Sequence, residues 1–169
     1  MFSKLLVENF YYLEDETKTN CDEFDFGDNN PTIIINGQHE LDCFTDNPKA
    51  KAYKGKIIIK GDDITRLKGS QFRGYSFKSI DIPVSVTELG GSVFYQCIGL
   101  TSVSIPSLVT SIGGYAFYQC TRLTSVTIPS LVTKIGSGTF ANCSKLTSVT
   151  IPDSVMAIED SAFINCKEL

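Results

Sequence analysis

The strongest constraint on the fold of this sequence is internal repetition. The chain repeats one unit at a fixed spacing, and the full units begin at Cys97, Cys120 and Cys143. The three full units read CIGLTSVSIPSLVTSIGGYAFYQ, CTRLTSVTIPSLVTKIGSGTFAN and CSKLTSVTIPDSVMAIEDSAFIN. An earlier unit spans residues 74–96, and a degenerate unit precedes it. Ile33–Ile35, which precede the similar Ile57–Ile59, are interpreted as the opening of a further, cap-like unit. Repetition at a fixed period of this kind indicates units that stack and share one core.

The residues within each unit explain the period, with Cys97 counted as position 1. Apolar residues at positions 7 and 9, such as Val103 and Ile105, have the two-residue period of a strand. Proline at position 10 ends that strand, since it cannot donate a hydrogen bond to a neighbouring strand. A shorter apolar pair, a glycine and a phenylalanine follow. The glycines are expected to permit a turn with unusual dihedral angles, and they are Gly90, Gly113 and Gly136.

One unit is too short to fold alone, because its few apolar side chains cannot offset the entropy lost when its whole backbone becomes ordered. Stacking places like residues on like residues and lets the strands pair in parallel. The sequence therefore predicts a β-rich solenoid. A composition with 42% hydrophobic and 20% charged residues agrees with a folded chain rather than a disordered one.

The motif LTSVTIPS-x-VT-x-IG-x-x-xF-x-x-C resembles the 23-residue leucine-rich repeat of the BspA-like family. The resemblance implies a right-handed superhelix with a parallel concave sheet, used for binding, and some relatives act as adhesins for host matrix proteins. We expect one continuous domain. Its expected parts are an N-terminal helix and acidic cap over 1–30, degenerate repeats over 31–73, and BspA-like repeats over 74–169. Residues 3–13 place Leu6, Phe10 and Leu13 at helical spacing, which favours a short capping helix.

If the apolar residues of LTSVTIP face inward, positions 6 and 8 face outward on the concave sheet. Position 5 adds Lys78 and three threonines. These outward residues have two interpretations. They could simply be small hydroxyl residues that suit an exposed sheet, or they could form a polar recognition surface for protein or glycan. The candidate partner-binding residues are Lys78, Ser79, Asp81, Ser102, Ser104, Ser125, Thr127, Ser148 and Thr150.

Three tyrosines lie outside the expected core. Tyr95 and Tyr118 share position 22, and Tyr115 precedes Phe117 by two residues. Partial packing on the adjacent unit is the favoured interpretation, and anchoring of a partner is the alternative. The glutamine or asparagine at position 23 is expected to hydrogen-bond the turning backbone.

The cysteines at position 1 are interpreted as buried free thiols, and no spacing typical of a zinc site accompanies them. These residues are Cys97, Cys120, Cys143 and Cys166. His39 and Cys43 would share a face only if their segment were helical, and the neighbouring Ile33–Ile35 and turn residues favour strand and loop instead. We therefore predict no catalytic, metal or cofactor site, and no enzymatic activity.

Charge is divided unevenly, with a net −8 over residues 1–50 and +4 over residues 51–169. The bases gather between Lys49 and Lys78, either as a surface balanced by the acidic start or as a docking patch for an anionic partner. No nucleic-acid motif and no apolar run long enough for a membrane helix occurs. We expect a protein partner, self-association or coverage at the C-terminal edge, and a cytoplasmic location. A cell-surface adhesin with its export signal absent from this chain is the alternative.

Overall fold

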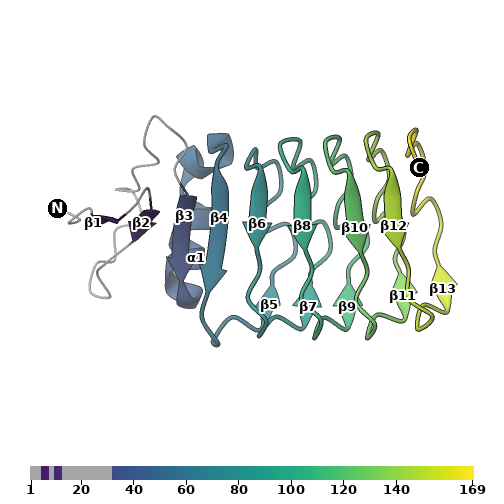
Figure 1. Ribbon diagram of the computed structural model, residues 1–169, viewed down its shortest axis with the longest axis horizontal. Helices are drawn as coiled ribbons and strands as arrows, with labels where there is room; N and C mark the ends of the chain where they lie inside the picture. Colours follow the sequence, from purple (N-terminus) through teal and green to yellow (C-terminus); the bar gives the residue numbers. More distant parts are fainter. Residues whose placement is uncertain (1–4, 8–9, 13–31) are drawn as a thin grey trace.

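The computed structural model describes residues 5–7, 10–12 and 32–169, which form a single stack of coils along one axis (Figure 1). One long face of the stack consists of parallel strands. They are β3 (Thr32–Asn36), β4 (Lys56–Lys60), β6 (Ser79–Asp81), β8 (Ser102–Ser104), β10 (Ser125–Thr127) and β12 (Ser148–Thr150). Val103 lies opposite Ile80, and Val149 lies opposite Val126. The predicted β-rich solenoid is confirmed.

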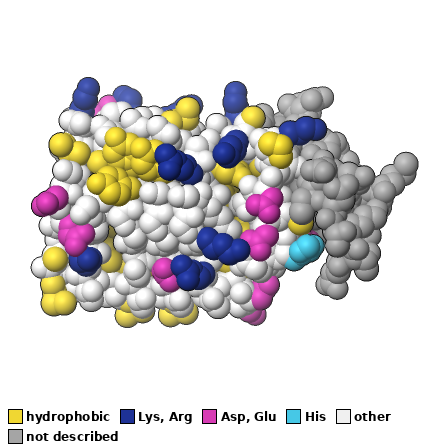
Figure 2. Space-filling view, turned by 180° about the vertical axis from the view of Figure 1, so that it is seen from behind, with side chains coloured by type: hydrophobic (Ala, Val, Ile, Leu, Met, Phe, Trp, Pro, Cys, Tyr) yellow, Lys and Arg dark blue, Asp and Glu magenta, His cyan; other side chains and the backbone are white. Residues whose placement is uncertain are grey.

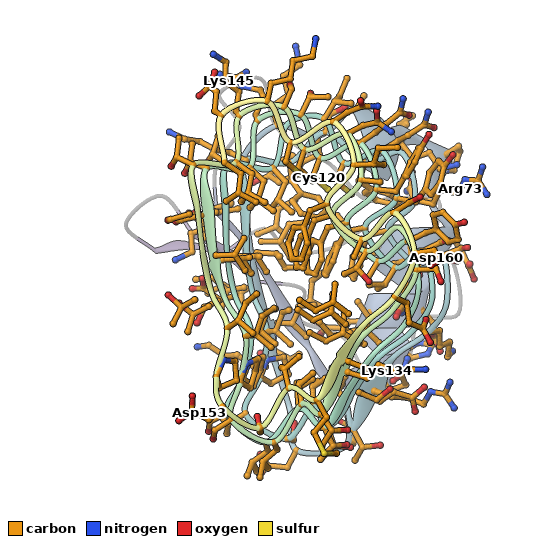
Figure 3. The ribbon with its side chains drawn as sticks, turned by 90° about the vertical axis from the view of Figure 1, so that its right-hand side faces the viewer. Arg73, Cys120, Lys134, Lys145, Asp153 and Asp160 are labelled. Carbon is orange, nitrogen blue, oxygen red and sulfur yellow. The ribbon has the colours of Figure 1, made fainter. Side chains whose placement is uncertain are left out.

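A second row of two-residue strands lies across the core from the first (Figure 3). It consists of β5 (Arg66–Leu67), β7 (Glu88–Leu89), β9 (Ser111–Ile112), β11 (Lys134–Ile135) and β13 (Ala157–Ile158). These strands also pair in parallel, with Leu67 opposite Leu89 and Leu89 opposite Ile112. Each repeat is therefore a flattened coil with one strand on each long side.

The N-terminal region differs from the sequence prediction. β1 (Leu5–Val7) and β2 (Phe10–Tyr12) form an antiparallel pair, and β2 continues the sheet in parallel with β3. The capping helix predicted over 3–13 is therefore wrong for the described residues of that segment. Aromatic and β-branched residues suit a strand, and the edge of β3 offers backbone groups that need partners. The remaining part of the predicted 1–30 cap lies outside the described residues.

The segment around His39 and Cys43 is also different, because it forms helix α1 (Gly37–Asp46) rather than strand and loop. Leu41 and Phe44, three residues apart, are fully buried where α1 packs beside β3 and β4. The backbone N–H of Asn36 donates to the Glu40 carboxylate at 2.5 Å and holds the first turn. A 3-10 turn, η2 (Pro48–Ala52), then leads into β4.

A ladder of phenylalanine rings runs through the core. Phe72, Phe94, Phe117, Phe140 and Phe163 stack in order, with ring centroids 5.6, 5.2, 5.3 and 5.4 Å apart and interplanar angles between 5° and 23°. The first four rings are fully buried. Since each ring packs against its equivalents in the neighbouring coils, this column ties the spacing of one coil to the next.

The glycines at position 17 are explained by close approach rather than by the dihedral angles that the sequence suggested. Gly90, Gly113 and Gly136 lack the left-handed backbone. A Cβ on Gly90 would lie 2.5 Å from the backbone nitrogen of Gly69, and one on Gly113 would overlap the backbone of Gly91. The non-glycine left-handed residues are instead at positions 19 and 23, including Ser92, Tyr115, Gln96 and Gln119 with φ from 56° to 58°.

Removing one ring from the middle of the ladder is expected to destabilise the fold strongly. Phe117→Ala leaves a cavity between Phe94 and Phe140, with an expected loss of about 3–5 kcal/mol in the free energy of unfolding. Urea denaturation measures the loss. Phe163→Ala is the matched control, because that ring is only half-buried and stacks on Phe140 alone among the described residues. An equal loss in both variants would contradict a role for stacking from both sides.

The close approach at position 17 predicts that Gly113→Ala costs about 1–3 kcal/mol, since the added methyl group must displace backbone. Gly91→Ala is the control, because its Cβ would lie 3.5 Å from the carbonyl oxygen of Gly114, an ordinary contact. Both substitutions reduce the entropy of the unfolded chain similarly. Thermal unfolding compares them, and equal midpoints would rule out the steric explanation.

Candidate functional site

The concave face comprises the outward side chains of β6, β8, β10 and β12. Inward residues such as Val126 are buried or half-buried, whereas their neighbours along each strand point to solvent. The structure brings the sequence-predicted residues together on this face. Ser79 and Asp81 are half-buried, and the exposed members are Lys78, Ser102, Ser104, Ser125, Thr127, Ser148 and Thr150.

The hydroxyl groups on this face fall into two classes. The threonines at position 5 bind the preceding coil: Thr101 donates to the carbonyl oxygen of Lys78 at 3.1 Å, and Thr147 donates to that of Thr124 at 3.0 Å. The seven hydroxyls at positions 6 and 8 make no side-chain hydrogen bond within the described part of the chain. Their donors and acceptors are therefore available to a partner.

Charge on the concave face is confined to its N-terminal end. Asp81 forms an ion pair with Lys56 at 2.6 Å, so its charge is balanced within the sheet. β8, β10 and β12 present only serine and threonine outward. The face thus offers a neutral polar lattice, with strands spaced by about 4.8 Å.

The opposite side carries the tyrosines, visible as an exposed hydrophobic cluster in Figure 2. Tyr95 stacks on Tyr118 with centroids 4.6 Å apart, and Tyr115 meets Tyr118 edge-on at 5.9 Å. The guanidinium group of Arg73 lies 4.4 Å above the Tyr95 ring. The rings therefore pack across adjacent coils, as the sequence favours, and cover one another's faces. Tyr115, which is 46% exposed, is the most exposed of the three.

The amides at position 23 do not hydrogen-bond the turning backbone as expected. They bond to one another instead, with the Gln96 Nε2 donating to Gln119 Oε1 at 2.7 Å and the Asn165 Nδ2 donating to Asn142 Oδ1 at 2.8 Å. Their left-handed backbone directs these side chains along the stack, where equivalent amides meet. The pattern of identical positions contained this signal, because amides repeated at one spacing can pair with each other.

Several bases between Lys49 and Lys78 are neutralised by acids one coil away. Arg66 contacts Glu88 at 3.3 Å, and Lys68 contacts Asp42 at 2.9 Å. The acidic residues between positions 8 and 28 lie outside the described residues. Within the described part, the fold therefore balances a share of this basic segment by stacking opposite charges on neighbouring coils.

Comparison with known proteins agrees with this repeat geometry. Residues 50–169 match the BspA type leucine rich repeat region, in six copies. The chain belongs to this family. The BspA-type resemblance suggested by the motif is thereby confirmed.

Solved structures share the fold of this BspA-type chain. A T. pallidum leucine-rich repeat protein superposes with a TM-score of 0.63 at 22% identity, covering 82% of this chain and 72% of that one. A leucine-rich cell surface protein from Faecalibacterium prausnitzii superposes with a TM-score of 0.60 at 32% identity, covering 79% of this chain. This chain spans only 35% of the second protein. Among curated proteins, the search finds no match.

The cysteines at position 1 of the BspA-type repeats are free thiols, as the sequence indicates. Cys97, Cys120 and Cys143 are buried, and each sulfur donates to the carbonyl oxygen of a phenylalanine earlier in the stack, as Cys97 does to Phe72 at 3.0 Å. Burial raises the pKa of Cys97 and of Cys143 to about 12 and that of Cys120 well above 9.0. These thiols therefore stay protonated and serve as core residues.

His39 and Cys43 do meet on α1, with Nε2 and Sγ 4.0 Å apart. Cys43 is disulfide-bonded, however, so its sulfur supplies no thiolate nucleophile. The described residues contain no cluster of three or more side chains suited to a metal ion. No helix within them has the length and apolar character needed to cross a bilayer.

The raised thiol pKa values predict a stability that falls in alkaline solution. The unfolded thiol loses its proton near its ordinary pKa of 9.0, whereas the folded thiol of Cys120 keeps it. The contribution of the Cys120 thiol to the free energy of unfolding is therefore fully present below about pH 8, and it declines as the pH rises further. Urea unfolding of the parent chain and of Cys120→Ala at about pH 8 and pH 10.5 isolates the effect. The variant is expected to lose less stability, and identical losses would contradict the assignment.

Proposed function

We propose that this chain is a non-enzymatic protein-binding module whose partner lies on the concave face. The observation that carries the proposal is the exposed lattice of hydroxyls at positions 6 and 8, which have no side-chain partners among the described residues. These hydroxyls belong to Ser79, Ser102, Ser104, Ser125, Thr127, Ser148 and Thr150. Lys78 and Asp81 complete the proposed surface at its N-terminal end.

The rigidity of the scaffold supports binding at this face. Coil-to-coil hydrogen bonds anchor both ends of each outward segment, for example from the N–H of Thr147 to the carbonyl oxygen of Thr124 at 2.9 Å. The stacked Phe ladder fixes the strands from behind. A surface ordered before association loses little conformational entropy when a partner binds. A neutral polar face also avoids the cost of desolvating unpaired charges.

Bulky charged substitutions on the concave face are expected to abolish partner capture. The triple variant Ser102→Arg, Ser125→Arg and Ser148→Arg fills one column of the lattice, and pull-down from native lysate with quantitative mass spectrometry compares it with the parent chain. We expect captured partner to fall by about tenfold or more.

The control places two of these three added charges elsewhere on the coils, and it is compared with the double variant Ser102→Arg and Ser125→Arg as well as with the triple variant. Ser107→Arg and Ser130→Arg alter exposed position 11, in the turn after the strand proline. Figure 3 shows this edge at Asp153, the equivalent residue of the last coil. Unchanged capture by the concave variant, or equal loss in the control, would move the partner away from the concave face.

A second candidate function is a cell-surface adhesin that binds a host matrix protein or glycan. Two observations favour it over a cytoplasmic module. Cys43 is disulfide-bonded, and disulfides persist mainly in oxidising compartments. One structural neighbour is named a leucine-rich cell surface protein. Fractionation of the native protein, with thiols counted before and after reduction, separates the two candidates: surface recovery with an intact disulfide supports the adhesin.

A further inference from the structure

A basic groove lies at the edge where the strands of the concave face begin. Three positively charged residues from different coils line it, namely Lys54, Lys78 and Arg122, around a hollow of about 570 Å³. Figure 2 shows Lys and Arg side chains gathered along the same long edge of the molecule, and Figure 3 places Lys145 there. This groove borders the proposed protein-binding face and shares Lys78 with it.

The hollow exists because one coil lacks a side chain at position 3. Ser76, Gly99, Arg122 and Lys145 occupy this position in successive coils. A Cβ on Gly99 would overlap the carbonyl oxygen of Ser76, so the backbone there runs too close to its neighbour for any other residue. The gap between Ser76 and Arg122 is thus a fixed feature of the fold, and it forms the floor of the groove.

The charges of the groove are arranged unlike those elsewhere on the coils. Lys134 pairs with Glu159 at 2.8 Å, and Lys145 pairs with Glu168 at 2.6 Å, in each case across neighbouring coils. No acidic residue lines the groove among the described residues. Lys78 and Arg122 form no ion pair with another described residue, so an anionic ligand would supply the negative charge that these two bases lack.

The uncharged residues that line the groove indicate which class of anionic ligand fits it. Ser76 and Thr121 contribute hydroxyl groups without side-chain hydrogen bonds in the described part of the chain, and Ile98 is 54% exposed at the wall. Hydroxyls beside a small apolar surface match a sugar ring with its polar edges and C–H faces. None of the described residues that line the groove is aromatic, so a nucleic acid would lack the stacking platform that its bases use.

We propose that the basic groove binds an anionic polysaccharide that carries sulfate or carboxylate groups. Lys78 and Arg122 contact the anionic groups from coils on either side of Gly99, while Ser76 and Thr121 hydrogen-bond sugar hydroxyls. The two sites share Lys78, whereas Ser76, Thr121 and Arg122 belong to the groove alone. Arg122→Ala by itself should therefore weaken polysaccharide binding and leave the concave-face partner bound.

Titration with heparin as the sulfated probe, and with unsulfated dextran as the neutral one, tests the proposal. The parent chain is expected to bind heparin but not dextran, with affinity that falls as salt rises. Lys78→Ala with Arg122→Ala should weaken heparin binding by about tenfold or more. The control, Arg66→Ala with Lys134→Ala, removes the same charge from exposed bases of β5 and β11 and should bind heparin like the parent.

Three results would overturn the proposal. In the first, the parent chain does not bind heparin. In the second, the groove variant and the control variant lose heparin affinity equally. In the third, the groove binds a single-stranded oligonucleotide or poly-glutamate more tightly than heparin. Unfolding midpoints verify that the variants are folded. If the alanine variant unfolds early, Lys78→Gln with Arg122→Gln keeps the aliphatic stems and provides the same comparison.

Discussion

Every part of this molecule depends on the requirement that each coil superimpose on the next. The Phe ladder enforces that requirement in the core, where rings from Phe72 to Phe163 stack at 5.2–5.6 Å. Backbone hydrogen bonds enforce it at the periphery, as between the N–H of Phe94 and the carbonyl oxygen of Ala116 at 2.8 Å. A coil that deviated in length or shape would lose both sets of contacts at once. The strict period of the sequence follows from this constraint.

Because the coils superimpose, a residue's position in the repeat decides its neighbours. Thr101 and Thr124 donate to the coil before them, Gln96 pairs with Gln119, and Tyr95 stacks on Tyr118. Chemical variety arises where one coil departs from its column. Gly99, between Ser76 and Arg122, opens a hollow without disturbing the strands on either side. Binding features can therefore differ from coil to coil while the core stays constant.

Period, strands, core phenylalanines, buried thiols and the outward hydroxyls were predictable from the sequence, since each is a consequence of the repeat. Features set by a single contact were not. Helix α1 depends on the packing of Leu41 and Phe44 beside β3 and β4, and nothing in its residues repeats. β2 depends on the free edge of β3. The role of Gly113 lies in its distance to Gly91, which spacing alone does not reveal. The spacing places Gln96 and Gln119 in one column, but the direction of their side chains depends on their left-handed backbone.

The thiol column has a consequence for the chemistry of the whole chain, which contains a disulfide at Cys43 beside free cysteines in the coils. Disulfide exchange requires an accessible thiolate to attack sulfur. Cys97, Cys120 and Cys143 offer neither access nor ionisation, because they are enclosed and donate their protons to carbonyl oxygens. These three thiols can thus stay reduced under conditions that hold Cys43 oxidised, whereas Cys166 is only half-buried and lacks the same protection.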